Sequence, residues 1–416
     1  MSSTISNPTG RTNTKTNAKT LEGVPLLDLK RQHLQLRDEV LAALARVYDS
    51  GAFVLGPEVT QLEQKIAAYC EVRHAIGCAS GSDALLLALM AVGVGPGDEV
   101  ILPSFTFFAT ASAVTRLGAK LVFADIDPKS FNMDPVAVMR LITPATKVIL
   151  PVHLFGQCAD MDAFCRIANA AGLQVIEDAA QAIGAELNGC RAGSMGQIGC
   201  FSFYPTKNLG GAGDGGMLTT QDADLADRLR LLRGHGMRPR YYHQLVGINS
   251  RLDSFQAAVL NVKLPHLDHW AAERMANANR YAELFAEAGL DRVLVLPETA
   301  SKRRHVWNQY VIRVVDGRRD ALRDALAEDH VGTEIYYPLG LHQQQCFHDL
   351  GYAPGDLPET DRAAREVLAL PIFPELTAEE QRHVVERIRV FFSARRGGSS
   401  PTAPQFLTHQ AARKRG

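Results

Sequence analysis

Short apolar runs alternate with segments of helical period through the first half of the chain. Continuous runs of Val, Ile and Leu are typical of strands that are buried on both faces. Such runs, spaced by helices, indicate βαβ units and a parallel sheet with helices on both sides. We therefore predict an α/β fold with strands at 74–79, 99–103, 120–124, 147–152, 173–176 and 216–220.

Apolar residues at helical spacing predict the helices around these strands. Pro57 suits the first turn of one helix, and Pro265 interrupts the longest. The segment 234–251, rich in Gly, His, Tyr and Arg, is predicted to be a long loop. The predicted helices are 30–48, 57–70, 84–92, 107–117, 134–142, 161–171, 222–233 and 253–284.

A second, smaller α+β domain is predicted toward the carboxyl end. Its expected elements are a strand at 308–315, a helix at 319–328, a strand at 331–337 and a helix at 378–393. A chain of 416 residues suggests roughly two domains. We expect a disordered tail at 1–20, a large domain at 21–265, a small C-terminal domain at 266–395 and a flexible tail at 396–416.

Composition argues against several classes of protein. The sequence has 44 Lys and Arg and 45 Asp and Glu, a net charge of -1. This charge does not favour binding to nucleic acid or to an anionic membrane. No apolar run reaches the ~18 residues of a membrane helix. The seven scattered cysteines form no C-x-x-C pair. They are interpreted as reduced core residues of a cytoplasmic protein, and no disulfide frame or metal site is expected.

A single lysine, Lys207, follows the apolar run 200–204 and precedes a glycine-rich stretch. It has no charged neighbour close in sequence. A lysine between a strand and a tight turn can be partly desolvated, which lowers the pKa of its amine and makes the amine available for a Schiff base. A solvated loop lysine is an equally good interpretation of this stretch alone.

Two further stretches place polar groups at predicted strand ends, where ligands bind in parallel sheets. Ser80-Gly81-Ser82-Asp83 joins a strand to an apolar helix, and the helix N–H groups with the Ser82 hydroxyl form either a phosphate seat or an ordinary N-cap. Asp178 ends a buried strand, where it can pair with a cationic ring nitrogen or cap a helix. Gln181, one turn later, can reach the same ligand.

Aromatic and basic residues complete the candidate site. Phe105 and Phe107 follow a strand, where an aromatic ring stacks on a planar cofactor or packs in the core. Asn249 and Arg251 suit an anionic phosphate or carboxylate, or a capping segment with a surface Arg. A phosphate seat, an aromatic face, an acid for a ring nitrogen and a Schiff-base lysine are together what pyridoxal 5'-phosphate requires.

These residues resemble the DegT/StrS family of pyridoxal-phosphate aminotransferases, which act on nucleotide-linked keto sugars. The resemblance covers about residues 24–392 and implies fold type I, with a mostly parallel seven-stranded sheet in the large domain. Position 82 is Ser where the family more often has Thr, and the hydroxyl is kept. The motifs that carry the resemblance are Gly81-Ser82-Asp83-Ala84-Leu85, Pro103-Ser104-Phe105-Thr106-Phe107, Glu177-Asp178-Ala179-Ala180-Gln181, Phe201-Ser202-Phe203 with Lys207, Gly213-Asp214-Gly215-Gly216 and Asn249-Ser250-Arg251-Leu252-Asp253.

The resemblance also implies roles for these residues. Lys207 would bind the cofactor as a Schiff base and move the proton, while Asp178 would pair with the pyridine nitrogen. Asn249, with Arg251, would reach the site of the neighbouring subunit, which implies a homodimer. The remaining cofactor contacts that it implies are Phe107 on the ring face, Gln181 near the ring oxygen, and Gly81, Ser82 and Ser202 at the phosphate.

By the same resemblance, the reaction is amino transfer from L-glutamate to an NDP-linked keto sugar. The alternatives are a catalytically inactive regulatory protein on the same fold, and another pyridoxal-phosphate enzyme such as a sugar dehydratase, whose relatives carry His in place of the lysine. The segment 238–243 favours a 3-keto over a 4-keto sugar, and the choice of UDP, dTDP or GDP stays open. Substrate contacts are expected in polar loops, at Tyr241, Tyr242, His243, Arg251, Tyr336, Tyr337 and His342.

Overall fold

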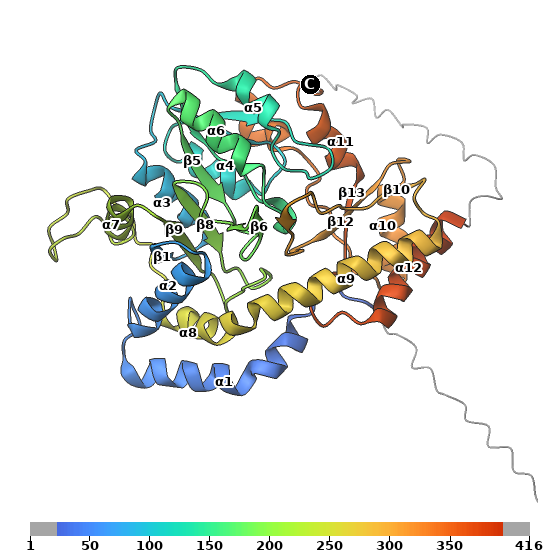
Figure 1. Ribbon diagram of the computed structural model, residues 1–416, viewed down its shortest axis with the longest axis horizontal. Coiled ribbons are helices and arrows are strands. Elements are labelled where there is room, and N and C mark those ends of the chain that lie inside the picture. The colour runs from blue at the N-terminus through green and yellow to red at the C-terminus, as the bar shows by residue number, and fades with distance from the viewer. Residues whose placement is uncertain (1–22, 394–416) are drawn as a thin grey trace, which may run out of the picture.

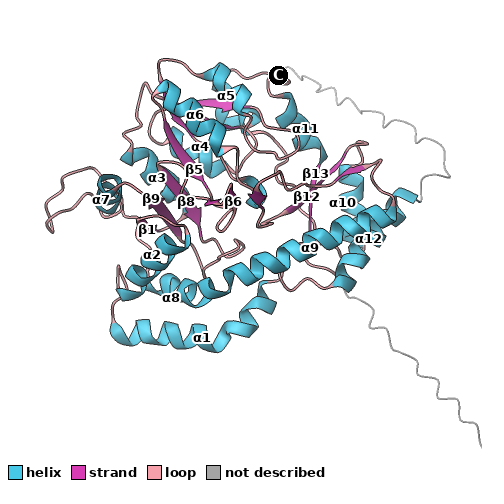
Figure 2. Ribbon diagram, viewed as in Figure 1, coloured by secondary structure: helices cyan, strands magenta, loops and turns pink. Residues whose placement is uncertain are grey.

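The computed structural model describes residues 23–393, which form an α/β structure with one large and two small sheets (Figures 1 and 2). The large sheet has seven strands in the order β1-β9-β8-β5-β4-β2-β3. Only β9 runs antiparallel to its neighbours in this sheet. The predicted α/β fold with a mostly parallel seven-stranded sheet is therefore confirmed. The predicted tails at 1–20 and 396–416 lie outside the described residues.

The strands of the large sheet carry apolar residues on both faces. They are β1 (His74–Cys78), β2 (Glu99–Pro103), β3 (Lys120–Ala124), β4 (Thr146–Ile149), β5 (Gln174–Asp178), β8 (Ile198–Ser202) and β9 (Gly216–Thr220). Because successive side chains of a strand point to opposite faces, Val175 packs in one core and Ile176 in the other. The next two residues of β5, Glu177 and Asp178, are separated in the same way.

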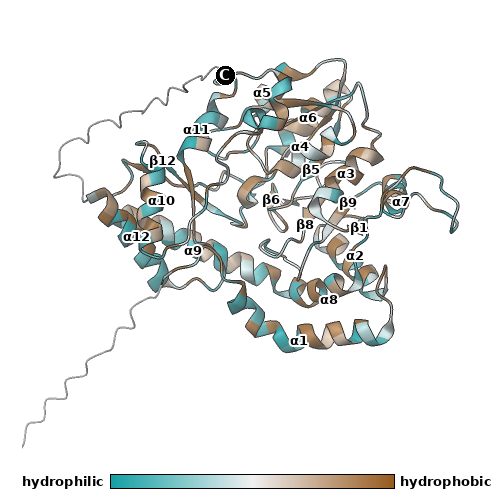
Figure 3. Ribbon diagram, turned by 180° about the vertical axis from the view of Figure 1, so that it is seen from behind, coloured by the Kyte–Doolittle hydropathy of each residue, from teal (hydrophilic) through white to brown (hydrophobic). Residues whose placement is uncertain are grey.

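Helices cover both faces of this sheet, as the sequence predicts. One face carries α3 (Gly81–Ala91), α4 (Phe108–Thr115) and α7 (Ala223–Leu232). The other carries α2 (Pro57–Tyr69), α5 (Pro135–Leu141), α6 (Met161–Ala171) and α8 (Ser254–Lys263). Helix α3 is apolar over most of its length because it is buried against the sheet (Figure 3). Helix α1 (Leu29–Ser50) lies along α8 (Figure 1).

A second core surrounds the small sheet, whose order is β10-β12-β13. Its strands are β10 (Leu294–Val295), β12 (Tyr310–Val314) and β13 (Val367–Leu370). The long helix α9 (Leu267–Ala288) follows the 3-10 turn η2 (Leu264–His266), where Pro265 was predicted to interrupt the helix. It runs from below the large sheet to this second core (Figure 1). The division of the chain into domains at 265 stays a prediction.

One expectation for the second half of the chain is wrong, and two elements there were not expected. The segment 331–337 is not a strand, because only single bridges join Val331 to Val24 and Glu334 to Ala369. The third strand is β13, which follows helix α11 (Pro358–Glu366), and neither element was predicted. Helices α10 (Arg319–Glu328) and α12 (Ala378–Ser393) have the predicted bounds. The short strands β6 (Glu186–Leu187), β7 (Cys190–Arg191) and β11 (Arg303–Arg304) form the third sheet.

Three properties expected from composition can be compared with the described residues. Within 23–393, no helix is long and apolar enough to cross a membrane. The same residues contain no cluster of His, Cys, Asp or Glu suited to a metal ion. Cys190 and Cys346 are exposed, so the expectation of core cysteines is wrong for these two, whereas Cys70, Cys78, Cys158 and Cys200 are buried.

Candidate active site

Lys207 lies in the loop between β8 and β9, near the carboxyl end of β5. Burial lowers the pKa of its amine to about 8, and the negative charge of Asp178 opposes this shift. Among residues 23–393, no atom accepts a hydrogen bond from this amine. A partly neutral, uncommitted amine is the state that a nucleophilic lysine needs.

The loop around Lys207 is fixed by contacts from three directions. Within the loop, the Lys207 N–H donates to the carbonyl of Tyr204 at 2.8 Å. From α8, the Lys263 amine donates to the carbonyl of Gly210 at 2.7 Å. Next to the lysine, the Asn208 amide donates to the carbonyl of Val306 at 2.8 Å. The lysine backbone is therefore held while its side chain stays uncommitted.

Asp178 ends β5 on the face that α4 covers, and it is 5% exposed. Its Oδ2 accepts from the Thr110 hydroxyl at 2.8 Å, and its Oδ1 from the Ala180 N–H at 3.2 Å. Burial raises the pKa of the carboxyl, and these two bonds and the charge of Lys207 oppose the rise. The carboxylate keeps acceptor capacity for one more donor, since it has roughly four lone-pair sites.

Glu177 points to the opposite face and is satisfied by the protein alone. Its Oε2 accepts from Gly193 N–H at 2.7 Å and from His153 Nε2 at 2.9 Å. Its Oε1 accepts from the N–H groups of Met195 and Gly196 at 2.8 and 2.6 Å. His153 Nδ1 accepts from the Ala159 N–H, which places the ring hydrogen on Nε2. Glu177 is therefore a structural residue, although it adjoins Asp178 in sequence.

The start of α3 forms a cradle against the end of β8. A Cβ added to Gly81 would lie 2.6 Å from the Cβ of Ser202, so only glycine allows this approach. Ser80 caps α3 by accepting from the Asp83 N–H at 3.1 Å, and Ser82 stays exposed. Free N–H groups at a helix start, with two serine hydroxyls nearby, fit a phosphate group.

The aromatic pair at the end of β2 divides into a core residue and an exposed one. Phe105 is fully buried, and its ring meets Tyr337 edge-on with centroids 5.8 Å apart. Phe107 is 60% exposed and tilts toward Tyr337 at 6.5 Å. The Gln181 Oε1 accepts from the Phe155 N–H at 2.7 Å, which fixes its side chain. Phe107 is thus the ring available for stacking, and Phe105 packs in the core.

The expected substrate contacts have different surroundings. Tyr336 and Arg251 are half-buried. His342 is 2% exposed, and its Nδ1 lies 2.7 Å from the Ser104 hydroxyl. Its Nε2 lies 3.3 Å from Asp361 Oδ1 and makes no hydrogen bond within the described residues. The histidine joins the end of β2 to the segment after Tyr337, and its role as a substrate contact stays a prediction.

The predicted long loop after α7 projects from the body of the protein (Figure 1). Arg238 fixes its base through a bidentate ion pair with Asp227 at 2.7 and 2.8 Å. Tyr241 and Tyr242 at its tip are 74% and 70% exposed. Asn249 is exposed where the loop returns, and only its backbone bridges to Gly234. These side chains are free to meet a molecule outside this chain.

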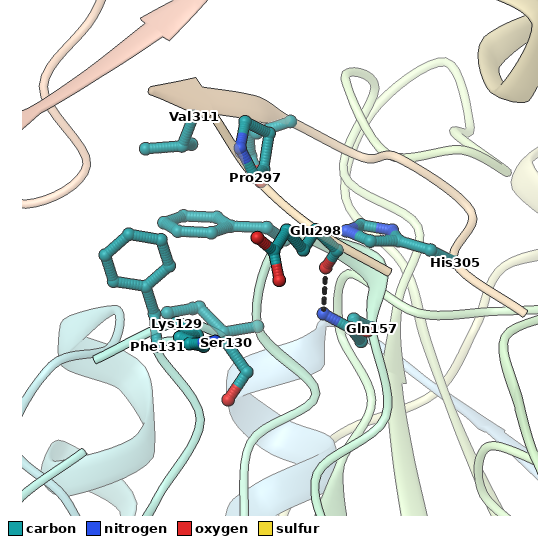
Figure 4. A pocket seen from close by; sticks show the side chains of 11 residues that line it. Lys129, Ser130, Phe131, Gln157, Pro297, Glu298, His305 and Val311 are labelled. Atoms are coloured by element: carbon teal, nitrogen blue, oxygen red, sulfur yellow. Dashed lines mark hydrogen bonds between the residues drawn. The ribbon is translucent and has the colours of Figure 1, made fainter. Parts of the chain in front are cut away.

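A small cavity lies between the segment 154–157 and the start of the second core (Figure 4). Phe131, Phe155, Glu298 and His305 are among its lining residues, and the Gln157 side chain donates across it to the Glu298 carbonyl at 3.2 Å. Its volume of ≈ 10 Å³ is about that of one water molecule. This cavity therefore cannot hold a nucleotide-linked sugar.

The fold and this site first define a class of protein. A mostly parallel sheet, a desolvated lysine after β8 and a buried aspartate at the end of β5 are the features of fold type I pyridoxal-phosphate transferases. Comparison with known proteins gives the family. The chain belongs to the DegT/DnrJ/EryC1/StrS aminotransferase family, whose model matches residues 34–389.

Individual relatives are similar over nearly their whole length. A pleiotropic regulatory protein of Geobacillus stearothermophilus is 53% identical over 369 residues, 89% of this chain and 98% of the relative. A UDP-N-acetyl-3-dehydro-alpha-D-glucosamine 3-aminotransferase of Acidithiobacillus ferrooxidans is 46% identical over 366 residues, 88% and 97% of the two chains. The crystal structure of S. venezuelae DesV in complex with a ketimine intermediate superposes with a TM-score of 0.84 at 45% identity, covering 89% and 98%.

Proposed function

We propose that this protein is a pyridoxal 5'-phosphate-dependent aminotransferase that moves an amino group from L-glutamate to an NDP-linked keto sugar. The observation that carries the proposal is the pairing of an uncommitted, desolvated lysine with a buried, incompletely bonded aspartate. The aminotransferase family supports the reaction. The Acidithiobacillus relative, whose name is that of an aminotransferase acting on a 3-dehydro sugar, supports the class of acceptor.

The residues present fit the proposed cofactor. The cradle of Gly81, Ser82 and Ser202 suits its phosphate, and Phe107 and Gln181 suit its ring. When bound, the cofactor supplies an electron sink for the carbon that gives or receives the amino group. The role of Asp178 is to face the ring nitrogen and keep it protonated. The Lys207 amine binds the cofactor and then takes and returns the proton at the reacting carbon.

The finer features of the proposal concern the sugar and the second subunit. A 3-keto sugar is the favoured acceptor, supported by the name of the Acidithiobacillus relative. We propose a homodimer in which Asn249 and Arg251 serve the neighbouring subunit's site. The exposure of Asn249 at the base of the projecting loop supports this assignment. Tyr336, which is half-buried beside Tyr337, is the proposed substrate contact from the same chain.

An absorbance experiment tests the proposal. Protein reconstituted with pyridoxal phosphate should show the band of the covalently bound cofactor, and L-glutamate should bleach it. Addition of UDP-, dTDP- or GDP-linked keto sugars, in matched 3-keto and 4-keto pairs, should restore the band only with the true acceptor. Lys207→Ala should abolish the band. Lys263→Met, which removes another buried lysine with a pKa of about 8, should keep it.

A regulatory role is the second candidate, because the relative at 53% identity is named a pleiotropic regulatory protein. A purely regulatory chain has no need of an amine and a carboxylate that burial perturbs at one strand end. A bound cofactor that glutamate cannot bleach would favour regulation over transamination. A sugar dehydratase is disfavoured because position 207 is Lys and not His.

A further inference from the structure

Thr110 is a buried residue of α4 whose hydroxyl approaches three acceptors. Its Oγ1 lies 2.8 Å from Asp178 Oδ2, 3.2 Å from the Phe107 carbonyl and 3.2 Å from the Thr106 hydroxyl. Thr110 has 0% and Thr106 2% of its surface exposed. Buried hydroxyls without a packing role are costly unless they are bonded. We therefore look for the role of Thr110 in its hydrogen bonds.

One proton per hydroxyl determines the direction of the bonds. The shortest contact of Thr110 is with the carboxylate, and a charged acceptor forms the stronger bond. Thr110 therefore donates to Asp178, and the Phe107 carbonyl is left to accept from the Thr110 N–H at 3.3 Å. Thr106 can then donate to the Thr110 oxygen. The result is a chain of two hydroxyls that ends on one oxygen of Asp178.

The two hydroxyls fix the orientation of the Asp178 carboxylate but leave it with unused acceptor capacity. Thr110 occupies one lone pair of Oδ2, and the Ala180 N–H occupies one of Oδ1. The same turn of α4 presents Phe107, so one backbone segment sets both the ring-stacking face and the carboxylate. Other titratable groups that face the carboxyl are Lys207, His153, Tyr337 and Cys200.

We propose that Thr110, supported by Thr106, is a positioning residue that holds Asp178 ionised and aimed at the ring nitrogen of the cofactor. The inference rests on the proposed function for the identity of the cofactor. The hydrogen bond between Thr110 and Asp178 is formed within this chain and does not depend on the identity of the cofactor. The site requires the hydroxyl of Thr110 and not its volume. Replacement of the hydroxyl by a methyl group should leave packing intact and release the carboxylate.

Thr110→Val is the test, because valine keeps the shape and removes the hydroxyl. We expect kcat to fall about 10- to 100-fold, as for loss of a hydrogen bond to a charged group, with the KM for glutamate within about 2-fold of wild type. The spectral titration of the bound cofactor should move to higher pH. A ring nitrogen that is less fully protonated withdraws less electron density from the imine, so the imine is more basic and keeps its proton to higher pH.

Matched variants separate positioning from packing. Thr110→Ser keeps the hydroxyl and should retain most activity and the wild-type titration, and Thr106→Val should show a smaller shift in the same direction. Thr115→Val, on the same helix, removes a hydroxyl that bonds only to the Ala111 carbonyl and should change neither readout. Should Thr110→Val fold poorly, Thr106→Val and Thr110→Ser still carry the test.

Two results would overturn the proposal. One is a Thr110→Val protein with wild-type kcat and wild-type spectral titration. The other is a Thr110→Ser protein as impaired as Thr110→Val, because that result assigns the effect to packing. Failure of the proposed function is a separate outcome, since it would appear in the wild-type protein as no cofactor band or no bleaching by glutamate.

Discussion

Glu177 and Asp178 are adjacent carboxylates at the end of one buried strand, and their surroundings differ completely. Glu177 receives three backbone N–H groups and a histidine ring. Asp178 receives one N–H and one hydroxyl, and burial raises its pKa. The alternation of side chains along β5 separates the two environments. Complete bonding gives Glu177 a structural role, and incomplete bonding leaves Asp178 with acceptor capacity for the proposed cofactor.

Two lysines repeat the same contrast. Burial lowers the pKa of both Lys207 and Lys263 to about 8. Lys263 donates to the Gly210 carbonyl, in the loop that carries Lys207, whereas Lys207 is committed to no acceptor in the described part of the chain. A perturbed pKa alone therefore does not identify the functional lysine, because structural contacts perturb pKa values too. The unused bonding capacity is what separates the two.

The largest expected effect is on turnover, in the pair Asp178→Asn and Glu177→Gln. Asp178→Asn should lower kcat about 10²- to 10³-fold, as for loss of one preorganised electrostatic group. The unfolding free energy of its cofactor-free form should not fall. Because burial raises the folded pKa of this carboxyl, ionisation destabilises the folded state as pH rises above the unfolded pKa, and asparagine removes that loss. Steady-state kinetics and urea denaturation of the two proteins check this.

The second effect is on stability, and it falls on Glu177. The Glu177 carboxylate accepts hydrogen bonds from four donors. In Glu177→Gln one of its oxygens becomes an NH₂ group, which cannot accept and leaves the donors that face it unpaired. We expect the unfolding free energy to fall by about 3 kcal/mol, a typical cost of breaking a buried charged network. Denaturant unfolding without cofactor is the measurement. A Glu177→Gln protein as stable as wild type, with impaired turnover, would reverse the roles of the two acids.

Much of this contrast was readable from the sequence, and the missing part has a physical cause. The strands β2 and β3 were predicted because buried parallel strands leave continuous apolar runs. Lys207, Asp178 and Gly81 stand in recognisable stretches between strands and helices. The segment 331–337 was wrongly predicted as a strand because its β-branched residues favour a strand, whereas only single bridges join the segment to other parts of the chain and no ladder forms. Strand β13 (Val367–Leu370) was not predicted, although all four of its residues are apolar.

Partners distant in sequence could not be predicted from local pattern. Thr110 lies 68 residues from Asp178, and the sequence of α4 does not indicate that the two side chains form a hydrogen bond. A local signal did exist, since Thr110 is one helical turn after Phe107 and so faces the same side. The burial of His342 could not be predicted for the same reason. A histidine in a polar stretch suggests exposure, and its burial depends on Ser104, 238 residues earlier.

A third, smaller effect concerns pH and separates the two lysines. The rate of covalent cofactor attachment to the cofactor-free protein should rise through pH 8, because the neutral amine of Lys207 is the proposed nucleophile. About 10% of an amine with that pKa is neutral at pH 7 and about 90% at pH 9, so the rate should rise roughly 9-fold. Stopped-flow absorbance measures it. Lys263→Met should give the same midpoint, and a shifted midpoint would assign the titration to the wrong lysine.

The smallest effect is expected from Lys263→Met itself. The variant loses one hydrogen bond to the Gly210 carbonyl, worth about 1 kcal/mol, and like Lys207→Met it also loses the desolvation cost of a buried ammonium group, so at pH 7 it should be about 1 kcal/mol less stable than Lys207→Met. The folded pKa of Lys263, about 8, lies below its unfolded value. Between these two pH values the unfolded state binds more protons, so the free energy of unfolding rises with pH, and Lys263 contributes part of this rise. The variant should lose that part. Cofactor-free Lys207→Met should lose its own part of the rise as well. Because the Lys207 amine donates no bond in the described residues, equal unfolding free energies of the two variants at pH 7 would remove the distinction between the two lysines.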